Sequence, residues 1–177
     1  MDYIEKTINK KYVYEGKIIK VRCDDAQLPD GKPCVREMIE HNGGASVLYI
    51  EDEKVLLVRQ FRYAYGESLY EIPAGKLEGE EDSMLAAARE LEEEAGIKAG
   101  RLEKMFDFYP TPGYTNEKIY IYRAFDGERI AAHLDEGEFL DVEYIPLSRA
   151  RTMIENGEIK DGKTILALQA YFLSQNK

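Results

Sequence analysis

Apolar residues over most of the chain either alternate with polar ones or form short runs, and both patterns are typical of β-strands. Polar turns separate these runs, and two of them, Asp30-Gly31 and Glu51-Asp52-Glu53, predict hairpins. We therefore expect strands close to the following ranges: 11–16, 17–28, 33–41, 44–50, 54–61, 68–73, 102–108, 118–125 and 139–145.

Three segments follow the helical period instead. The first covers about 81–95 and is followed by Gly96 in the position of a C-terminal cap. Two more close the chain at about 147–156 and 161–173, and Asp161 is the expected N-cap of the last helix.

The first of these helices has an apolar side and an acidic side. We expect Glu81 to open the helix, where a carboxylate complements the helix dipole. The predicted core-facing stripe contains the apolar residues Leu91, Met84, Ala88 and Ala95.

Mixed strands with a few helices predict an α+β fold. The β-rich N-terminal piece is about 40 residues long, so we expect two parts, an N-terminal β segment at 1–42 and a larger domain at 43–177. The chain shows no internal repeat and no low-complexity segment.

Composition narrows the class of protein. A hydrophobic fraction of 44% and a charged fraction of 33% are those of an ordinary soluble globular protein. No apolar run approaches the roughly 18 residues of a membrane span, and the N-terminus lacks a signal-peptide pattern. The two cysteines, Cys23 and Cys34, are expected to be reduced thiols of a cytoplasmic protein.

A net charge of −10 argues against a broad basic face for nucleic acid. The same charge would repel a phosphorylated small molecule. If the substrate is of that kind, local arginines or divalent cations have to reverse the sign.

Candidate chemistry lies in 90-ELEEE-94. At about 100° per residue, Glu93 and Glu94 fall within about 60° of Glu90, on one ridge of the helix, whereas Glu92 points toward water. Carboxylates in this arrangement suit a hard cation such as Mg²⁺. The simpler alternative is a solvated acidic face in which Arg89 pairs with Glu93 across one turn.

Residues before the ridge complete a longer pattern. Gly75 follows Ile72-Pro73-Ala74 and breaks the chain there, so that a backbone carbonyl could point at the same cation, and Arg89 can brace the carboxylates from the side. Together these residues resemble the Nudix box, G-x5-E-x7-R-E-U-x-E-E-x-G-U with U aliphatic. The match is complete over 23 residues and consists of Gly75, Glu81, Arg89, Glu90, Leu91, Glu93, Glu94, Gly96 and Ile97.

Resemblance to the Nudix family implies an α/β/α sandwich with a mixed β-sheet, preceded here by a small antiparallel β segment. It also implies hydrolysis of a nucleoside diphosphate linked to another group, with Mg²⁺ or Mn²⁺ as cofactor. Glu90 and Glu94 would be the main metal ligands. Glu93 would be a further ligand or would hold the water, and the Ala74 carbonyl would complete the shell.

Segments outside the box are similar to the ADP-ribose pyrophosphatase branch of that family. Pro112, fifteen residues beyond Ile97, is one such feature. The others are 36-REMIEH-41, 59-RQFRYAYGESLYEIPAGKLE-78, 108-FYPTPGYTNE-117, 135-DEGEFLDVE-143 and 164-TILALQAYF-172. The implied reaction is Mg²⁺-dependent hydrolysis of ADP-ribose to AMP and ribose 5-phosphate.

The branch also implies roles for four residues outside the box. Arg36 and Arg62 would contact the substrate phosphates and ribose, the alternative being two surface arginines. In the late acidic loop, Glu138 would reach the metals and Glu136 would activate the water, or the two roles would be exchanged or merged. The alternative is a loop of plain solvated acids.

Adenine contacts and oligomeric state are further implications. Where the branch often has a large aromatic residue, this chain has Ile18, so Tyr12, Tyr14 or a partner chain would supply the adenine platform. The N-terminal segment would build a symmetric homodimer.

Two other readings stay open. One keeps the chemistry but changes the substrate to GDP-mannose, ADP-glucose, NADH or another nucleoside diphosphate compound. The other is a non-catalytic module that binds such a metabolite, which the intact set of carboxylates disfavours.

Overall fold

A computed structural model describes residues 3–175, and they fall into two compact units. The N-terminal unit contains the described residues up to Gly43 together with Tyr109–Lys118. The main unit contains Gly44–Phe108 and the described residues from Ile119 onward.

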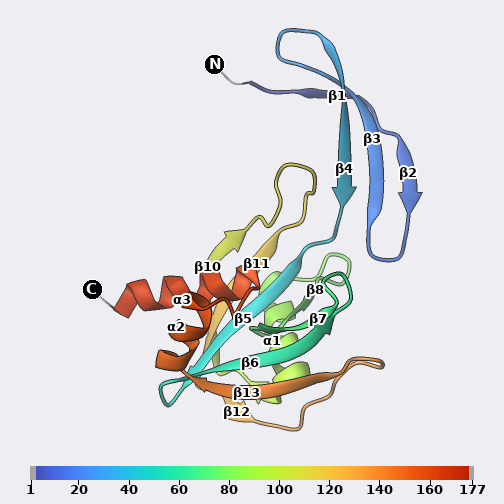
Figure 1. Ribbon diagram of the computed structural model, residues 1–177. Helices are drawn as coiled ribbons and strands as arrows, with labels where there is room; N and C mark the ends of the chain where they lie inside the picture. Colours follow the sequence, from blue (N-terminus) through green and yellow to red (C-terminus); the bar gives the residue numbers. More distant parts are fainter. Residues whose placement is uncertain (1–2, 176–177) are drawn as a thin grey trace. The chain divides into compact units, whose positions relative to one another are not determined.

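An antiparallel sheet forms the N-terminal unit (Figure 1, blue). Its central strand is β3, which pairs with β4 along its whole length and with β1 and β2 in its two halves. The β3–β4 pairing confirms the hairpin predicted at Asp30-Gly31. The strand bounds are β1 Lys6–Asn9, β2 Tyr12–Glu15, β3 Lys20–Gln27 and β4 Pro33–Glu40.

The interior of this unit is ionic rather than apolar. Arg22 and Asp24 are buried, and Arg22 forms ion pairs with Asp24 and with Glu40. Among its described residues, Ala26 is the one buried hydrophobic side chain. Large hydrophobic side chains lie instead on the surface: Tyr3, Ile4, Ile8, Tyr12, Val13, Tyr14, Ile18, Val35, Tyr109 and Tyr114.

The main unit is built on a seven-stranded mixed sheet with the order β10-β11-β5-β6-β13, to which β7 adds on β6 and β8 on β5. The β11–β5 pair is parallel and the other pairs are antiparallel. A second, two-stranded sheet joins β9 and β12. The bounds are β5 Gly44–Glu51, β6 Lys54–Arg62, β7 Glu67–Glu71, β8 Ala74–Lys76, β9 Ile97–Lys98, β10 Arg101–Phe108, β11 Ile119–Phe125, β12 Glu128–Arg129 and β13 Leu140–Pro146.

Helices cover both faces of this sheet, α1 (Ser83–Ala95) on one and α2 (Leu147–Glu155) with α3 (Gly162–Gln175) on the other (Figure 1). The central strand β5 is buried on both faces, because Leu48 packs in the core under α2 and α3 while Val47 packs in the core under α1. The predicted α/β/α sandwich is confirmed. No helix formed by residues 3–175 is long and apolar enough to cross a bilayer.

The start of α1 differs from the prediction. Asp82, not Glu81, is the N-cap, and its carboxylate accepts hydrogen bonds from the N–H groups of Met84 at 2.9 Å and Leu85 at 3.2 Å. Glu81 instead turns toward Arg89. Gly96 caps the other end in the left-handed conformation, with φ +62°, as predicted.

The buried face of α1 is also rotated from the predicted one. Leu91 is buried as expected, but Met84 is 41% exposed, so its assignment to the core was wrong. Ala86, Ala87, Glu90 and Glu94 are buried instead. The face that meets the sheet is thus centred between Leu91 and the carboxylate ridge, because Glu90 and Glu94 pack against the strand beside them.

Candidate active site

Strand β8 and helix α1 bring the ridge glutamates against a glycine. A Cβ at Gly75 would lie 1.9 Å from Oε1 of Glu90, so only the missing side chain allows this carboxylate its place. Glu90 is 8% exposed. The glycine of the sequence pattern is therefore required by close packing rather than by a turn.

Glu94 packs against the same strand one turn further along α1. It is 3% exposed and accepts a hydrogen bond from the Ala74 N–H at 3.1 Å. Residues 74 and 75 thus contact both buried carboxylates. The role expected for the Ala74 carbonyl stays a prediction.

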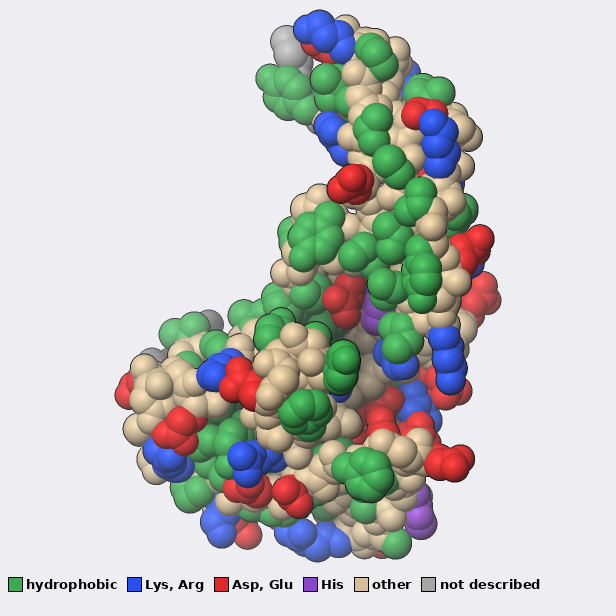
Figure 2. Space-filling view, turned by 45° about the vertical axis from the view of Figure 1, so that its right-hand side comes forward, with side chains coloured by type: hydrophobic (Ala, Val, Ile, Leu, Met, Phe, Trp, Pro, Cys, Tyr) green, Lys and Arg blue, Asp and Glu red, His purple; other side chains and the backbone are tan. Residues whose placement is uncertain are grey.

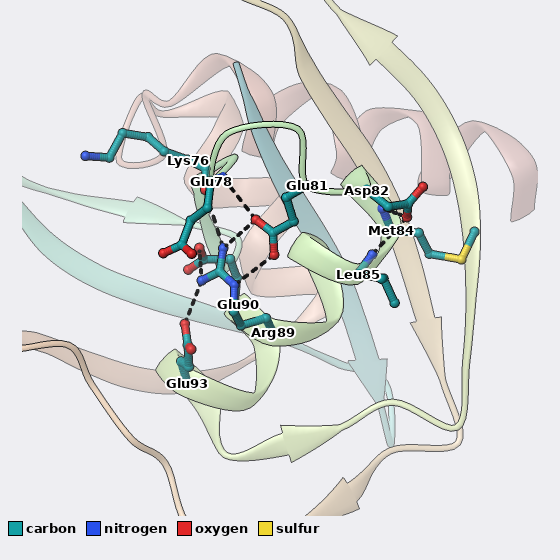
Figure 3. A network of polar contacts seen from close by, with 9 residues as sticks. All are labelled: Lys76, Glu78, Glu81, Asp82, Met84, Leu85, Arg89, Glu90 and Glu93. Carbon is teal, nitrogen blue, oxygen red and sulfur yellow. Dashed lines mark hydrogen bonds and ion pairs between the residues drawn. The ribbon is translucent and has the colours of Figure 1, made fainter. Parts of the chain in front are cut away.

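Arg89 is the hub of the exposed side of this cluster (Figure 3). It donates hydrogen bonds to Glu90 at 2.8 Å, to Glu93 at 2.8 Å and to both oxygens of Glu81 at 3.1 Å. These contacts raise the pKa of Arg89. The expectation that Arg89 braces the carboxylates is confirmed, and so is its pairing with Glu93.

Arg89 does not neutralise the buried end of the ridge. Burial, opposed by Arg89 and reinforced by the charges of Glu93 and Glu138, raises the pKa of Glu90 to about 7. Burial also raises the pKa of Glu94 to about 8, with the Ala74 N–H opposing the shift and the charges of Glu90 and Glu138 adding to it. Two acids at this depth, each repelled by the other, favour a cation between them.

The late acidic loop contributes unequally to the site. Glu138 is half-buried and close enough for its charge to act on Glu90 and Glu94. Glu136 is exposed. Between them Gly137 has a φ of +87°, and the Glu138 N–H closes a turn onto the Asp135 carbonyl at 3.0 Å.

The two predicted phosphate-binding arginines lie in different units. Arg62, at the end of β6, pairs with Glu71 at 2.6 and 2.7 Å, and its charge acts on Glu94. Arg36, on β4 of the N-terminal unit, is half-exposed and pairs with Glu5 at 2.7 Å. The main unit therefore brings Arg62 together with Glu90, Glu94 and Glu138.

Two functional candidates were missed by sequence reasoning. Glu71 is 2% exposed and Lys163 is 7% exposed, and they form an ion pair. Neither belongs to the box. The available signal was a charged residue between the apolar residues Tyr70 and Ile72 in the strand expected at 68–73.

Carboxylate oxygens are the donors that a hard divalent cation prefers, and here they lie beside a backbone strand held close by Gly75. Within residues 3–175, no group of three or more His, Cys, Asp or Glu side chains is arranged so that it could hold a metal ion. The ligand set Glu90, Glu93, Glu94, Glu138 and Ala74 consequently remains a prediction.

Family models match nearly the whole chain. A NUDIX domain model matches residues 40–168, and a model described as the nucleoside diphosphate sugar hydrolase N-terminal domain matches residues 5–39.

Known relatives extend this finding. The chain is 40% identical over 168 residues to an "ADP-ribose pyrophosphatase" of Bacillus subtilis (strain 168), and 39% identical to a "Methanol dehydrogenase activator" of Bacillus methanolicus. Each alignment covers 93% of this chain and 91% of the relative. A solved structure titled "Crystal structure of ADP compounds hydrolase" matches with a TM-score of 0.87 at 21% identity, covering 99% of this chain and 97% of the other, which shows the same fold.

The raised pKa values predict an unusual pH dependence of stability. The pKa of Glu94 is near 8 in the folded protein and has its ordinary value, near 4.5, in the unfolded chain. Between pH 4.5 and pH 8 the folded state therefore binds more protons than the unfolded state. The metal-free protein should therefore lose stability as the pH rises through that window. We expect a lower Tm at pH 8 than at pH 5.5 in excess chelator, and a larger rise in Tm on adding Mg²⁺ at pH 8.

Glu94→Gln serves as the control, because it removes the titrating group. Its Tm in chelator should depend less on pH than that of the wild type. Equal slopes for the two proteins would contradict the assignment.

Gly75→Ala should weaken metal binding with little loss of stability. The added Cβ displaces only the tip of the Glu90 side chain, which can swing away, but the carboxylate then leaves its place. We expect the Kd for Mn²⁺, measured by calorimetry, to rise about tenfold or more, as it does when support of a ligand is lost. Gly113→Ala is the matched control, since its Cβ meets open space. Unchanged Mn²⁺ affinity in Gly75→Ala would rule out this role.

Proposed function

Because this chain belongs to the Nudix family, we propose that it is a pyrophosphohydrolase that cleaves the diphosphate of ADP-ribose to give AMP and ribose 5-phosphate. The observation that carries the chemistry is the pair of buried acids, Glu90 and Glu94, fitted against Gly75 with raised pKa values. The ADP-ribose pyrophosphatase at 40% identity supports the substrate.

Nudix hydrolases generally use divalent metals, and Mg²⁺ is the proposed cofactor here, with Mn²⁺ as a substitute. Glu90 and Glu94 would be the main ligands, joined by Glu93, Glu138 and the Ala74 carbonyl. Bound there, the cation supplies charge neutralisation of the diphosphate and Lewis acidity. Its charge also offsets the net −10 of the chain near the substrate.

The chain's own residues bind the substrate and move a proton. Arg62 and Arg36 would hold the phosphates. A glutamate of the acidic loop would accept a proton from water as the water oxygen bonds to one phosphorus, and the bond from that phosphorus to the bridging oxygen would break, so that this oxygen leaves with the other phosphate. We assign the base to Glu136 and metal contact to Glu138, whose half-buried position near Glu90 and Glu94 supports this division. Glu93 would help hold the water.

A wider substrate range is the second candidate. It rests on the N-terminal match, whose model is described as belonging to nucleoside diphosphate sugar hydrolases in general. In that case the same carboxylates and arginines would act on the diphosphate, and the groups on either side of the diphosphate could differ from the adenosine and ribose of ADP-ribose.

Assembly as a homodimer is also proposed. The segment 1–42 would make the dimer contacts and supply part of the substrate contacts, and 43–177 would be the hydrolase domain. Figure 2 shows hydrophobic side chains exposed on the N-terminal unit, and within its described residues the one buried hydrophobic is Ala26. A sheet with so little apolar core gains stability from a partner that covers its surface. The proposed location is the cytoplasm, in keeping with free Cys23 and Cys34.

Glu94→Gln should abolish most turnover. The amide keeps the shape of the side chain but removes the charge that binds the cation, and we expect kcat to fall by about 100-fold or more. Glu92→Gln, on the outward side of the same helix, should retain wild-type kcat. Near-normal kcat in Glu94→Gln, or wild-type hydrolysis that persists in excess chelator, would contradict the metal role.

A substrate panel at fixed Mg²⁺ tests the proposed specificity. ADP-ribose, NADH, GDP-mannose and ADP-glucose are compared by kcat/KM, and ADP-ribose should lead by more than about tenfold. A smaller margin would favour the wider range. No turnover of any of the four compounds would refute the proposed function.

A further inference from the structure

A buried charge cluster lies beside the carboxylate site but outside the sequence box. Arg62 from β6 and Lys163 from the first turn of α3 both donate hydrogen bonds to Glu71 at the end of β7. Lys163 also pairs with Asp161 at 3.1 Å. The cluster joins three elements at one carboxylate, and Glu71 is almost inaccessible to solvent.

Backbone contacts tie the same region to the site. The Asp161 carboxylate accepts hydrogen bonds from the Thr164 N–H at 2.9 Å and hydroxyl at 2.6 Å, and that hydroxyl oxygen accepts one from the Ile72 N–H at 2.8 Å. Ile72 lies between β7, which ends at Glu71, and β8, which begins at Ala74, and the Ala74 N–H donates a hydrogen bond to Glu94. The start of α3 is therefore fixed to the segment between β7 and β8, two residues before Ala74.

The geometry of Arg62 leaves one edge for another ligand. Its Nε and Nη2 atoms are bound to the two oxygens of Glu71. Its Nη1 atom donates no hydrogen bond to any residue within 3–175. The Arg62 side chain is 37% exposed, and its guanidinium lies close enough to Glu94 for the two charges to interact.

Lys163 sets the charge of this cluster. Glu71 is ionised, because hydrogen bonds from Arg62 and the charges of Lys163 and Arg62 outweigh its burial and lower its pKa. The two cations and the two anions, Glu71 and Asp161, then sum to zero. Without Lys163 the net charge of the cluster would be −1. The charge of Glu71 would then be balanced by Arg62 alone, beside a site that must attract a diphosphate.

We propose that Lys163 and Glu71 are positioning residues for substrate binding. Glu71 fixes the Arg62 guanidinium with Nη1 free for a substrate phosphate. Lys163 shares the negative charge of Glu71, so that the positive charge of Arg62 is not fully offset at that contact. The inference rests on the proposed function, because it takes the substrate to be a diphosphate. It adds to the site a helix, α3, that shares no residue with the sequence box.

A double-mutant cycle separates this role from simple stabilisation. Lys163→Met should raise KM for ADP-ribose about tenfold, with kcat changed less than about twofold, since a charge-assisted phosphate contact is weakened. In an Arg62→Ala background the same change should add less than about twofold. Lys163→Arg, which keeps the charge, should stay near wild type. Lys160→Met is the matched control, because Lys160 makes an exposed ion pair with Glu67 of β7 at 2.7 Å.

Each other outcome overturns the proposal. A Lys163→Met effect of equal size in both backgrounds would show a structural role, and no effect in either would show no role. A normal KM in Arg62→Ala would remove the residue through which Lys163 acts.

The Kd for ADP, measured by calorimetry across the same four proteins of the cycle, repeats the test without turnover. If the four proteins show the expected coupling in ADP binding but the wild type hydrolyses none of the substrates, the proposed function alone is refuted. Turnover without coupling in either readout would refute this inference alone.

Discussion

Two carboxylates buried side by side are the constraint on which the rest of the site depends. Glu90 and Glu94 pack against β8 at a point where Gly75 leaves room for one and the Ala74 N–H binds the other. Such a pair is unfavourable by itself, because each acid is desolvated and repels the other. Binding of a proton or a cation relieves this cost, and the raised pKa values of the two acids reflect the same cost.

The surrounding charges divide into two groups that act on opposite ends of this pair. Arg89 gathers Glu81, Glu90 and Glu93 on the outer side of α1 and holds the ridge together without reaching Glu94. Arg62 approaches from the sheet, held by Glu71, which Lys163 in turn balances. In a chain with a net charge of −10, two arginines thus lie beside the buried acids.

Local spacing along the chain located the box residues, and the sandwich was implied by the resemblance to the Nudix family. Sequence reasoning also placed Glu81 at the helix start and Met84 in the core, and these two errors have separate causes, the choice of the capping side chain and the packing that orients α1. Asp82 captures the first N–H groups, and the helix rotates so that Glu90 and Glu94 meet β8. Helical periodicity gives the relative angles of side chains but not which of them faces the sheet.

Residues a few positions apart were enough to identify the family box, the acidic ridge with Arg89 as its brace, and the hairpin between β3 and β4, and the order of strand and helix patterns along the chain was enough for the α+β class. The burial of Glu90 and Glu94, and the contact of Arg62 and Lys163 with Glu71, emerged only in the folded protein. Glu71 and Lys163 are 92 positions apart, and no local pattern connects them. Their contact follows from the β6–β7 pairing and from the packing of α3 against the sheet, where a buried charge has to find its partner.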